Sequence, residues 1–214
     1  MSSFFVACLV SGVSYLRMED TRWNKFFDAT KDLRPSRTLV VALEAFGGVP
    51  AGAHAVDLGC GAGRDTLALL RNGWQVTAVD SSPLVPDLLA TPQFQPFAQA
   101  LDIQCTEFPQ AVWPEVELVN ASLALPFCCP QDFQNVWKKV VSGIKSGGRF
   151  AGNFFGPEDS WASRPQMTFL EKERLLVMFP DFDIELFDET HKDAPSVGGP
   201  VKHWHIFDVV ARKR

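Results

Sequence analysis

Three glycines separated by single residues follow a short apolar segment. The run V-D-L-G-C-G-A-G-R-D places Gly59, Gly61 and Gly63 between an expected strand, residues 55–58, and an expected helix, residues 64–72. Glycines in such a loop accept positive φ angles and let backbone N–H groups approach a ligand, and the start of the helix favours an anionic group. The segment therefore predicts a binding site for a nucleotide-like cofactor.

Two carboxylates flank this loop and narrow the choice of cofactor. Asp80 ends the next expected strand, residues 75–79, where an acidic side chain can accept hydrogen bonds from ribose hydroxyls. Asp57 lies two residues before the first glycine, where it would repel the pyrophosphate of a dinucleotide. It suits S-adenosylmethionine (SAM), which carries an ammonium and a sulfonium. The glycine spacing also differs from the G-x-G-x-x-G of dinucleotide sites, so SAM is favoured over the alternative, a nucleotide cofactor of an oxidoreductase.

These motifs resemble those of the class I SAM-dependent methyltransferases. The glycine run is similar to their first motif, V-T-A-V-D-S-S-P to the strand whose terminal acid holds the ribose, and E-L-V-N-A-S-L-A-L-P-F to their fourth motif. Within this class, G-C-G-x-G-R and the closing A-R-K resemble the tellurite-resistance type. The resemblance runs from Trp23 to the C-terminus and implies methyl transfer from SAM, with S-adenosylhomocysteine as product.

The resemblance also implies roles for residues at matching positions. The glycine loop would lie beside the methionine part of the cofactor, and Asp80 would hold the ribose. Ser81, Glu107 and Phe108 would border the adenine. Asn120 and Ala121 would face the methyl group. The implied cofactor-binding residues are Asp57, Gly59, Cys60, Gly61, Gly63, Asp80, Ser81, Glu107, Phe108, Asn120 and Ala121. The segment C-T-E-F departs from the usual Asp followed by an apolar residue, which puts the adenine contacts of Glu107 and Phe108 in doubt.

Methyl transfer from a sulfonium is an in-line displacement, so the protein must mainly position the acceptor and exclude water. A soft anionic acceptor needs no general base, whereas an alcohol or amine does. His203 and His205 lie two apart on an expected strand, residues 203–211, and share a face of the sheet. An antiparallel strand would bring His203 to the ligand-binding edge, which makes it a candidate catalytic residue. The resemblance implies that Asn120 faces the methyl group, so Asn120 is the second candidate. The alternative for His203 is a strand histidine with a backbone partner.

Four residues are candidates for contact with the methyl acceptor: Trp23, Phe27, Arg64 and Asn153. Each also has a structural interpretation. Trp23 and Phe27 belong to an aromatic stripe in an expected helix, residues 21–30, which can pack on the core. Arg64 can pair with Asp65 or Asp80. Cys128 and Cys129 are interpreted as packing residues rather than contacts of a metalloid.

Strands and helices alternate along most of the chain. The other expected helices span residues 37–46, 83–89, 132–144 and 168–179, and the other strands span 103–107, 116–121, 149–155 and 183–187. Alternation of this kind predicts a Rossmann-like, doubly wound α/β sheet that is mostly parallel. The connection at residues 188–202 contains no helix, so the last strand should be antiparallel. We expect the seven-stranded class I methyltransferase architecture in residues 21–214, preceded by an N-terminal extension, residues 1–20.

Composition limits the partners. The 214 residues carry a formal charge of −5 and an apolar fraction of 46%, which argues against nucleic acid and favours a small-molecule substrate. The first sixteen residues contain no Lys or Arg, which argues against a signal peptide. They are also too few for a membrane span. The five cysteines form no C-x-x-C pair and no zinc-type spacing, so no metal and a reducing, cytoplasmic location are expected. A non-catalytic protein that senses or sequesters SAM remains the alternative function.

Overall fold

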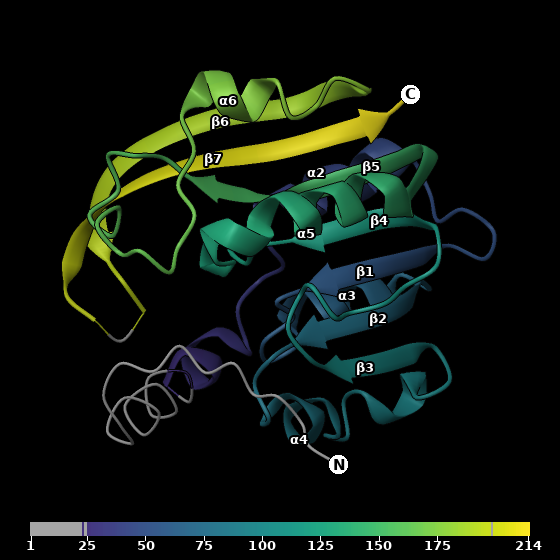
Figure 1. Cartoon of the computed structure of the whole chain (residues 1–214). Helices are drawn as coiled ribbons and strands as arrows, with labels where there is room; N and C mark the ends of the chain where they lie inside the picture. Colours follow the sequence, from purple (N-terminus) through teal and green to yellow (C-terminus); the bar gives the residue numbers. More distant parts are fainter. Residues whose placement is uncertain (1–22, 24, 198) are drawn as a thin grey trace, which may run out of the picture.

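A central sheet of seven strands organises the protein (Figure 1). The computed structural model describes residues 23, 25–197 and 199–214, so the expected extension at residues 1–20 lies outside the described residues. The strands are β1 His54–Leu58, β2 Gln75–Asp80, β3 Leu101–Cys105, β4 Val116–Ala121, β5 Ile144–Phe155, β6 Phe182–Pro195 and β7 Val201–Lys213. Their order is β3-β2-β1-β4-β5-β7-β6, with β1 to β5 parallel and β7 antiparallel to both neighbours. The predicted fold class is confirmed.

Helices cover both faces of the sheet and enclose two apolar cores. On one face lie α2 Arg37–Phe46, α3 Arg64–Arg71 and α4 Val85–Leu89; on the other lie α5 Pro130–Gly143 and α6 Lys172–Leu176. In α5 the buried residues recur at helical spacing, namely Phe133, Val136, Trp137 and Val140. Such a stripe must face the core, which is why the sequence forms a helix over this strand layer. Residues 25–30 are helical as predicted.

The strand order reverses direction between β1 and β4. The chain first moves outward from β1 to β2 and β3, and then returns to β4 on the other side of β1. In open α/β sheets, ligands bind outside the carboxyl ends of the strands at such a switch point. In Figure 1 the arrowheads of β1 to β4 point to one edge, toward the purple N-terminal segment and the yellow end of the β6–β7 hairpin.

The β6–β7 hairpin is longer than the sequence predicts. Residues 188–202 were expected to be an irregular connection, but the strands pair as far as Pro195 opposite Val201. β5 ends at Phe155 opposite Ile206, so the outer part of the hairpin pairs only with itself. Side chains of a two-stranded ribbon can stay polar on both faces, so no apolar alternation marked these strands in the sequence.

Several other elements differ from the prediction at their ends, and α6 and β3 illustrate the cause. The helix expected at residues 168–179 is ordered as α6 only over Lys172–Leu176, because the backbone N–H of Thr168 donates to Pro126 and Phe169 bridges Phe155. β3 begins at Leu101 rather than at residue 103. Both differences result from pairing with distant segments.

No helix in the described part of the chain is both long and apolar enough to cross a membrane.

Candidate functional site

The glycine loop between β1 and α3 adopts the backbone conformation that its residue types predict. Gly59, Gly61 and Gly63 have φ values of 69°, 52° and 79°. The space is also tight, because a Cβ atom on Gly59 would lie 2.5 Å from Cβ of Ala124 and one on Gly61 would lie 3.2 Å from the Phe27 ring. Only glycine meets both requirements without strain, so this backbone is open to close approach by a ligand.

Asp80 ties the glycine loop to the end of β2. Its Oδ2 accepts a hydrogen bond from the Gly61 N–H at 3.0 Å, and its Oδ1 accepts one from the Ser82 N–H at 2.9 Å. Burial raises the pKa of Asp80, while these backbone donors oppose the rise. Each carboxylate oxygen still has a lone pair, so the side chain can accept two further donors.

Below the loop lies a buried polar network. Asp57, Asp65 and Asn120 are at most 4% exposed. The Asn120 Nδ2 amide donates to Asp57 Oδ1 at 2.8 Å and to Asp65 Oδ2 at 3.2 Å, and Thr66 Oγ1 donates to Asp57 Oδ2. Burial, together with the charge of Asp65, raises the pKa of Asp57 to about 7. The network therefore concentrates negative charge in an apolar setting, where a cation is favoured.

One atom of this network has no partner. The Asn120 Oδ1 oxygen is buried and accepts no hydrogen bond from any described residue. The amide orientation follows from its surroundings, because Nδ2 lies between two carboxylates and the reverse placement would oppose oxygen to oxygen. Asp65 also accepts a hydrogen bond from outside this network, from Arg64 Nε to its Oδ1 at 3.1 Å. The orphaned oxygen marks a position where an additional donor fits.

A cavity of about 150 Å³ lies above the network. Its walls come from the N-terminal segment, the glycine loop, the loop after β4 and the tip of the hairpin: Phe26, Thr30, Leu33, Asp57, Gly59, Cys60, Gly61, Ala62, Arg64, Asp65, Ser122, Leu123 and Val197. It opens at the carboxyl edge of the strands, as expected for this architecture.

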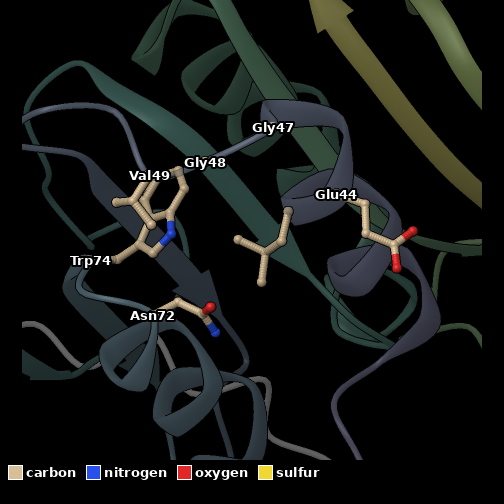
Figure 2. Close-up of a pocket in the computed structure, with 7 residues that line it drawn as sticks. Glu44, Gly47, Gly48, Val49, Asn72 and Trp74 are labelled. Carbon is tan, nitrogen blue, oxygen red and sulfur yellow. The ribbon is translucent and has the colours of Figure 1, made fainter.

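A larger hollow of about 340 Å³ lies elsewhere, at the amino end of β1 (Figure 2). It is formed by the end of α2 and the turn before β2, with Glu44, Asn72 and Trp74 among its walls. The Trp74 Nε1 atom is itself buried, and its ring packs edge-on against Phe46. Among the residues that line this groove, Glu44 is the one titratable side chain, so the smaller cavity is the better candidate for chemistry.

The structure brings most of the predicted cofactor residues together. Asp57, Gly59, Cys60 and Gly61 line the cavity, and Asp80 is bonded to its loop. Gly63 lies behind the loop, where a Cβ atom would meet Leu89 at 2.2 Å.

The residues predicted near the adenine are less tightly placed. Phe108 approaches Gly59, with its Cζ 3.7 Å from the Cβ position of that glycine. Ser81 and Glu107 are exposed. Ala121 is buried at the end of β4, next to Asn120.

The predicted acceptor residues fall into two groups. Phe27 covers Gly61, Trp23 stacks on Phe27, and Arg64 lines the cavity. Asn153 instead braces the loop after β4, because its Oδ1 accepts from the Leu123 N–H at 3.0 Å and its Nδ2 donates to Asp208.

His203 is not among the described residues that line the cavity. It lies on the hairpin, 36% exposed, with its Nδ1 2.8 Å from Asp193 Oδ1.

Sequence reasoning missed three residues that hold the site together. Asp65 and Thr66 join the buried network from the first turn of α3, and the buried Leu69 four residues after Asp65 is a helical-face signal that could have found it. Lys139 of α5 donates from Nζ to the Pro109 and Ala111 carbonyls, each at 2.7 Å, and so anchors the loop that carries Phe108. No sequence signal separates this lysine from those on a solvated helix face.

The sequence matches the family described as "Methyltransferase domain" over residues 55–148, from β1 to the start of β5. Residues 55–148 are thus similar to a methyltransferase domain. No match was found among curated proteins.

Solved structures share the fold across most of the chain. TehB from Haemophilus influenzae superimposes with a TM-score of 0.69 at 18% identity, over 82% of this chain and 61% of that one. This chain therefore spans less than two thirds of the TehB chain. The 1,6-didemethyltoxoflavin-N1-methyltransferase from Burkholderia thailandensis, crystallised with its substrate and S-adenosylhomocysteine, gives 0.62 at 21% identity, over 98% and 93% of the two chains.

The N-methyltransferase NodS from Bradyrhizobium japonicum, in complex with S-adenosylhomocysteine, gives a TM-score of 0.61 at 13% identity, over 94% of this chain and 88% of that one. These likenesses show that the chain shares its fold with the three solved structures.

The side chains around this cavity fit SAM. Asp80 retains lone pairs for two hydroxyl donors, and the buried Asn120 Oδ1 is an acceptor that lacks a donor. The buried carboxylates Asp57 and Asp65 favour a ligand that brings an ammonium and a sulfonium. The same groups would repel a pyrophosphate, so the donor set also argues against a dinucleotide.

Proposed function

We propose that this chain transfers a methyl group from SAM to a small-molecule acceptor. The observation that carries the proposal is the buried Asp57–Asn120–Asp65 network directly beneath a glycine loop that Asp80 ties to β2. SAM supplies an electrophilic methyl group on its sulfonium when bound. The fold and the matched domain support a methyltransferase, and the anionic floor of the cavity supports a cationic cofactor.

Different residues of the chain would hold different parts of the cofactor. Asp80 would accept the ribose hydroxyls, and the loop of Gly59, Cys60 and Gly61 would contact the methionine part. Asn120 keeps both carboxylates in place and would offer its Oδ1 to the ammonium. Lys139 fixes the loop on which Phe108 and Glu107 would border the adenine, with Ser81 beside it.

The acceptor would lie against Ser122, Leu123 and Arg64, under the aromatic cover of Phe27 and Trp23. Their contribution is to hold the nucleophile about 3 Å from the methyl carbon and to exclude water. Asn153 supports this wall by fixing the Leu123 backbone, whose φ of 51° is unusual for a residue with a side chain. The acceptor is thus aligned by backbone rather than by a mobile side chain.

A soft or already anionic nucleophile, such as a thiolate or a selenium or tellurium analogue, is the acceptor class we propose. No histidine is among the described residues lining the cavity, and a soft anion needs no general base. Arg64, which lines the cavity, would attract an anionic acceptor. Cys128 is not a candidate contact as a thiolate, because burial raises the pKa of its thiol to about 12.

A catalytic role for His203 stays a prediction. An alcohol or amine acceptor would require a base, and His203 would have to leave Asp193 to reach the cavity. Replacement of His203 by Ala tests this directly, since loss of turnover with unchanged SAM affinity would support the role.

A screen for methylated products tests the proposed function. Purified chain and SAM are incubated with thiols, chalcogen oxyanions, phenols and amines, and products are identified by mass spectrometry. We expect methylation of a thiol or chalcogen acceptor, abolished in Asp80→Ala. Methylation of amines alone would overturn the soft-acceptor proposal. SAM binding without any turnover would favour the alternative, a non-catalytic protein that senses or sequesters SAM.

We also propose a reducing, cytoplasmic setting. Cys60, Cys105 and Cys128 are free thiols, which supports this location.

A further inference from the structure

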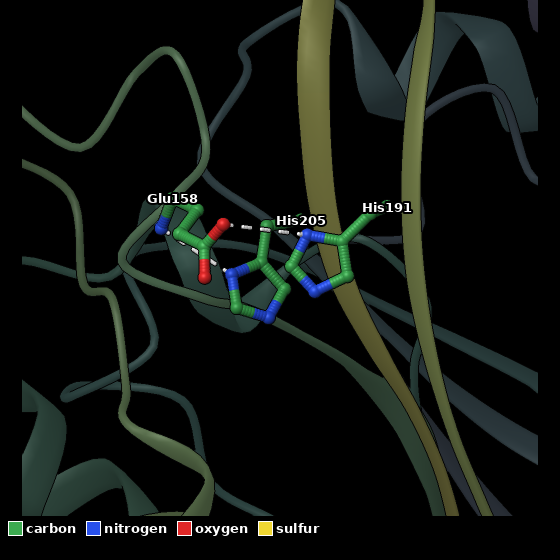
Figure 3. Close-up of side chains that lie close together, drawn as sticks. All are labelled: Glu158, His191 and His205. Atoms are coloured by element: carbon green, nitrogen blue, oxygen red, sulfur yellow. Dashed lines mark hydrogen bonds and ion pairs between the residues drawn. The ribbon is translucent and has the colours of Figure 1, made fainter.

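Three of the four histidines of the chain gather on the outer part of the β6–β7 hairpin. In the strand register His191 lies opposite His205, and Asp193 lies opposite His203. Alternate residues of a strand share a face, so Glu189 joins them. This face is turned toward Glu158, in the loop that follows β5 (Figure 3).

A carboxylate orients each of the three imidazole rings. His203 Nδ1 lies 2.8 Å from Asp193 Oδ1, and His205 Nε2 lies 3.1 Å from Glu189 Oε1. His191 Nε2 lies 3.5 Å from the same oxygen. These contacts place the N–H of each neutral ring on the carboxylate side and leave the lone pair on the opposite nitrogen. Metal-binding histidines are oriented in the same way by carboxylates behind them.

His191 Nδ1 and His203 Nε2 point toward one another, and His205 Nδ1 accepts a hydrogen bond from the Glu158 backbone N–H at 3.3 Å, which a bound ion would replace (Figure 3). His191 Nδ1 lies 3.5 Å from His203 Nε2 and 3.8 Å from Glu158 Oε2. One ligand atom each from Glu158, His191 and His205 lies within 4.8 Å of the other two. His191 Nδ1 and His203 Nε2 are at hydrogen-bond distance, so either a proton or a cation lies between them.

We propose that Glu158, His191 and His205 form a binding site for a divalent transition metal of the zinc type, with His203 as the nearest further nitrogen. Imidazole nitrogens with one carboxylate are a common zinc donor set. Tetrahedral ligands at zinc distances are about 3.4 Å apart, so the three side chains must close in by about an ångström.

The exposed members of the site can make this movement. The Glu158 and His191 side chains are 71% and 38% exposed, whereas His205 is 4% exposed. His205 is fixed because its ring packs against Gly156, where a Cβ atom would come within 2.2 Å. His191 stacks on His205 with ring centroids 4.0 Å apart, and must rotate to direct its nitrogen at a shared ion.

The site would join the loop after β5 to the hairpin, whose tip forms part of the cavity wall. Glu158 follows β5, and the hairpin carries Val197, which lines the cavity. A bound ion would hold the hairpin against the loop after β5 and so stiffen this wall. The ion would play no part in methyl transfer, and the proposal does not depend on that activity.

Metal binding by the full-length chain, without a histidine tag and after chelator treatment, tests the site. Zn²⁺ is titrated calorimetrically, and Co²⁺ is followed by the visible absorption of tetrahedral sites. We expect one ion per chain. His191→Ala and Glu158→Gln should each weaken Zn²⁺ binding about tenfold or more. His54→Gln is the matched control, because His54 contacts Thr77 across β1 and β2 and should leave the affinity unchanged.

Three results would overturn the proposal. They are the absence of saturable Zn²⁺ binding, an unchanged affinity in both site variants, and an equal loss in His54→Gln, which would indicate dispersed surface binding. Both site variants replace exposed side chains, and thermal melting verifies that they fold. SAM binding, measured separately, shows whether the cofactor site is intact, so the two proposals fail independently.

Discussion

At the scale of single residues, two carboxylates with different surroundings define the proposed cofactor site. Asp80 accepts backbone donors from both sides and links β2 to the glycine loop. Asp57 lies deeper and shares its donor Asn120 with Asp65. Burial is the largest cause of the raised pKa of both Asp57 and Asp80. Each is therefore an acid whose ionised form a cationic ligand would stabilise.

Replacement of Asp80 by Ala should weaken SAM binding about 100-fold, because two hydrogen bonds to a charged acceptor are together worth about 3 kcal/mol. Isothermal titration calorimetry measures the change. Asp102→Ala is the control, since Asp102 is an exposed residue of β3 that bonds to Gln104. An affinity within twofold of wild type in Asp80→Ala would rule out the ribose role.

SAM affinity should decrease as the pH falls from about 7 to about 5.5. The pKa of Asp57 is raised to about 7 by burial and by Asp65, so in the free protein the carboxyl takes up a proton over this range. A cation bound beside it favours the ionised form, so protonation competes with binding by up to about tenfold per pH unit below the pKa.

Asp57→Asn is the matched test of that pH dependence, because it removes the titrating group and keeps the shape of the side chain. This variant should bind SAM more weakly at pH 7, with little change in affinity on acidification. An equally steep pH dependence in Asp57→Asn would assign the effect to another group. Circular dichroism at each pH verifies that the protein is folded.

At the scale of elements, loops carry the residues that line the cavity, and hydrogen bonds from neighbouring strands fix the conformation of these loops. The glycine loop is fixed by hydrogen bonds from the Gly59 and Cys60 N–H groups to the Val79 carbonyl of β2. The loop after β4 is fixed by Asn153 of β5, which Asp208 of β7 holds in turn. Three neighbouring elements are therefore required for one cavity wall.

Gly59→Ala and Gly52→Ala form a matched pair. Both glycines have a φ near 68°, at 69° and 67°, so both substitutions cost about 1–2 kcal/mol in backbone strain. Only Gly59 has a neighbour within 4 Å, with Ala124 at 2.5 Å, so Gly59→Ala should lose about 1–3 kcal/mol more. It should also weaken SAM binding, whereas Gly52→Ala should not. Urea unfolding and calorimetry measure the two effects, and equal losses in stability would contradict the steric argument.

Asn153→Ala should lower the free energy of unfolding by about 2 kcal/mol, because it leaves the Leu123 N–H without its acceptor and removes a bond to the charged Asp208. Asn153→Asp should destabilise the protein more at pH 8, since two carboxylates would then face each other. Asn135→Ala on the exposed side of α5 is the control. A stability loss below about 0.5 kcal/mol in Asn153→Ala would show that the brace is weak.

At the scale of the whole molecule, the cavity is assembled from segments that are distant in the chain. Phe26 and Leu33 precede the first strand, Gly61 follows it, and Val197 lies near the end of the sequence. A ligand that contacts all of these segments can bind only when they are folded together. Ligand binding and global stability should therefore be linked.

S-adenosylhomocysteine at 100 times its dissociation constant should stabilise the folded state by about 2.7 kcal/mol. For a chain of this size, that corresponds to a rise of about 5–10 °C in the melting temperature. Differential scanning fluorimetry measures the shift, with NAD at the same concentration as the control. A shift with NAD alone would favour the oxidoreductase alternative.

Much of the site could be read from local sequence patterns. The three glycines, Asp57 and Asp80 lie within one strand–loop–helix–strand unit, where short-range spacing decides which residues meet. The same holds for α5, whose apolar stripe predicts both the helix and its buried face. Local periodicity and turn chemistry do not depend on the rest of the chain, which is why this unit and α5 form where the sequence predicts them. The cofactor roles of the residues stay predictions.

The outer hairpin could not be read in this way. Its strands are recognised only through their mutual register, and its polar side chains carry no apolar alternation. Asn153 illustrates the same limit, because its partners Leu123 and Asp208 lie 30 and 55 residues away in the chain. Pairing over such separations is decided by which strands become neighbours in the sheet.

The sequence by itself thus determined the fold class, the glycine loop and the positions of the two carboxylates of the proposed cofactor site, because these depend on residue type and short spacing. The tertiary structure alone decided that Asn120 lies between two buried carboxylates, that the hairpin reaches the cavity, and that His191 and His205 meet Glu158. Those contacts depend on strand order and register, which bring together side chains that no local pattern relates.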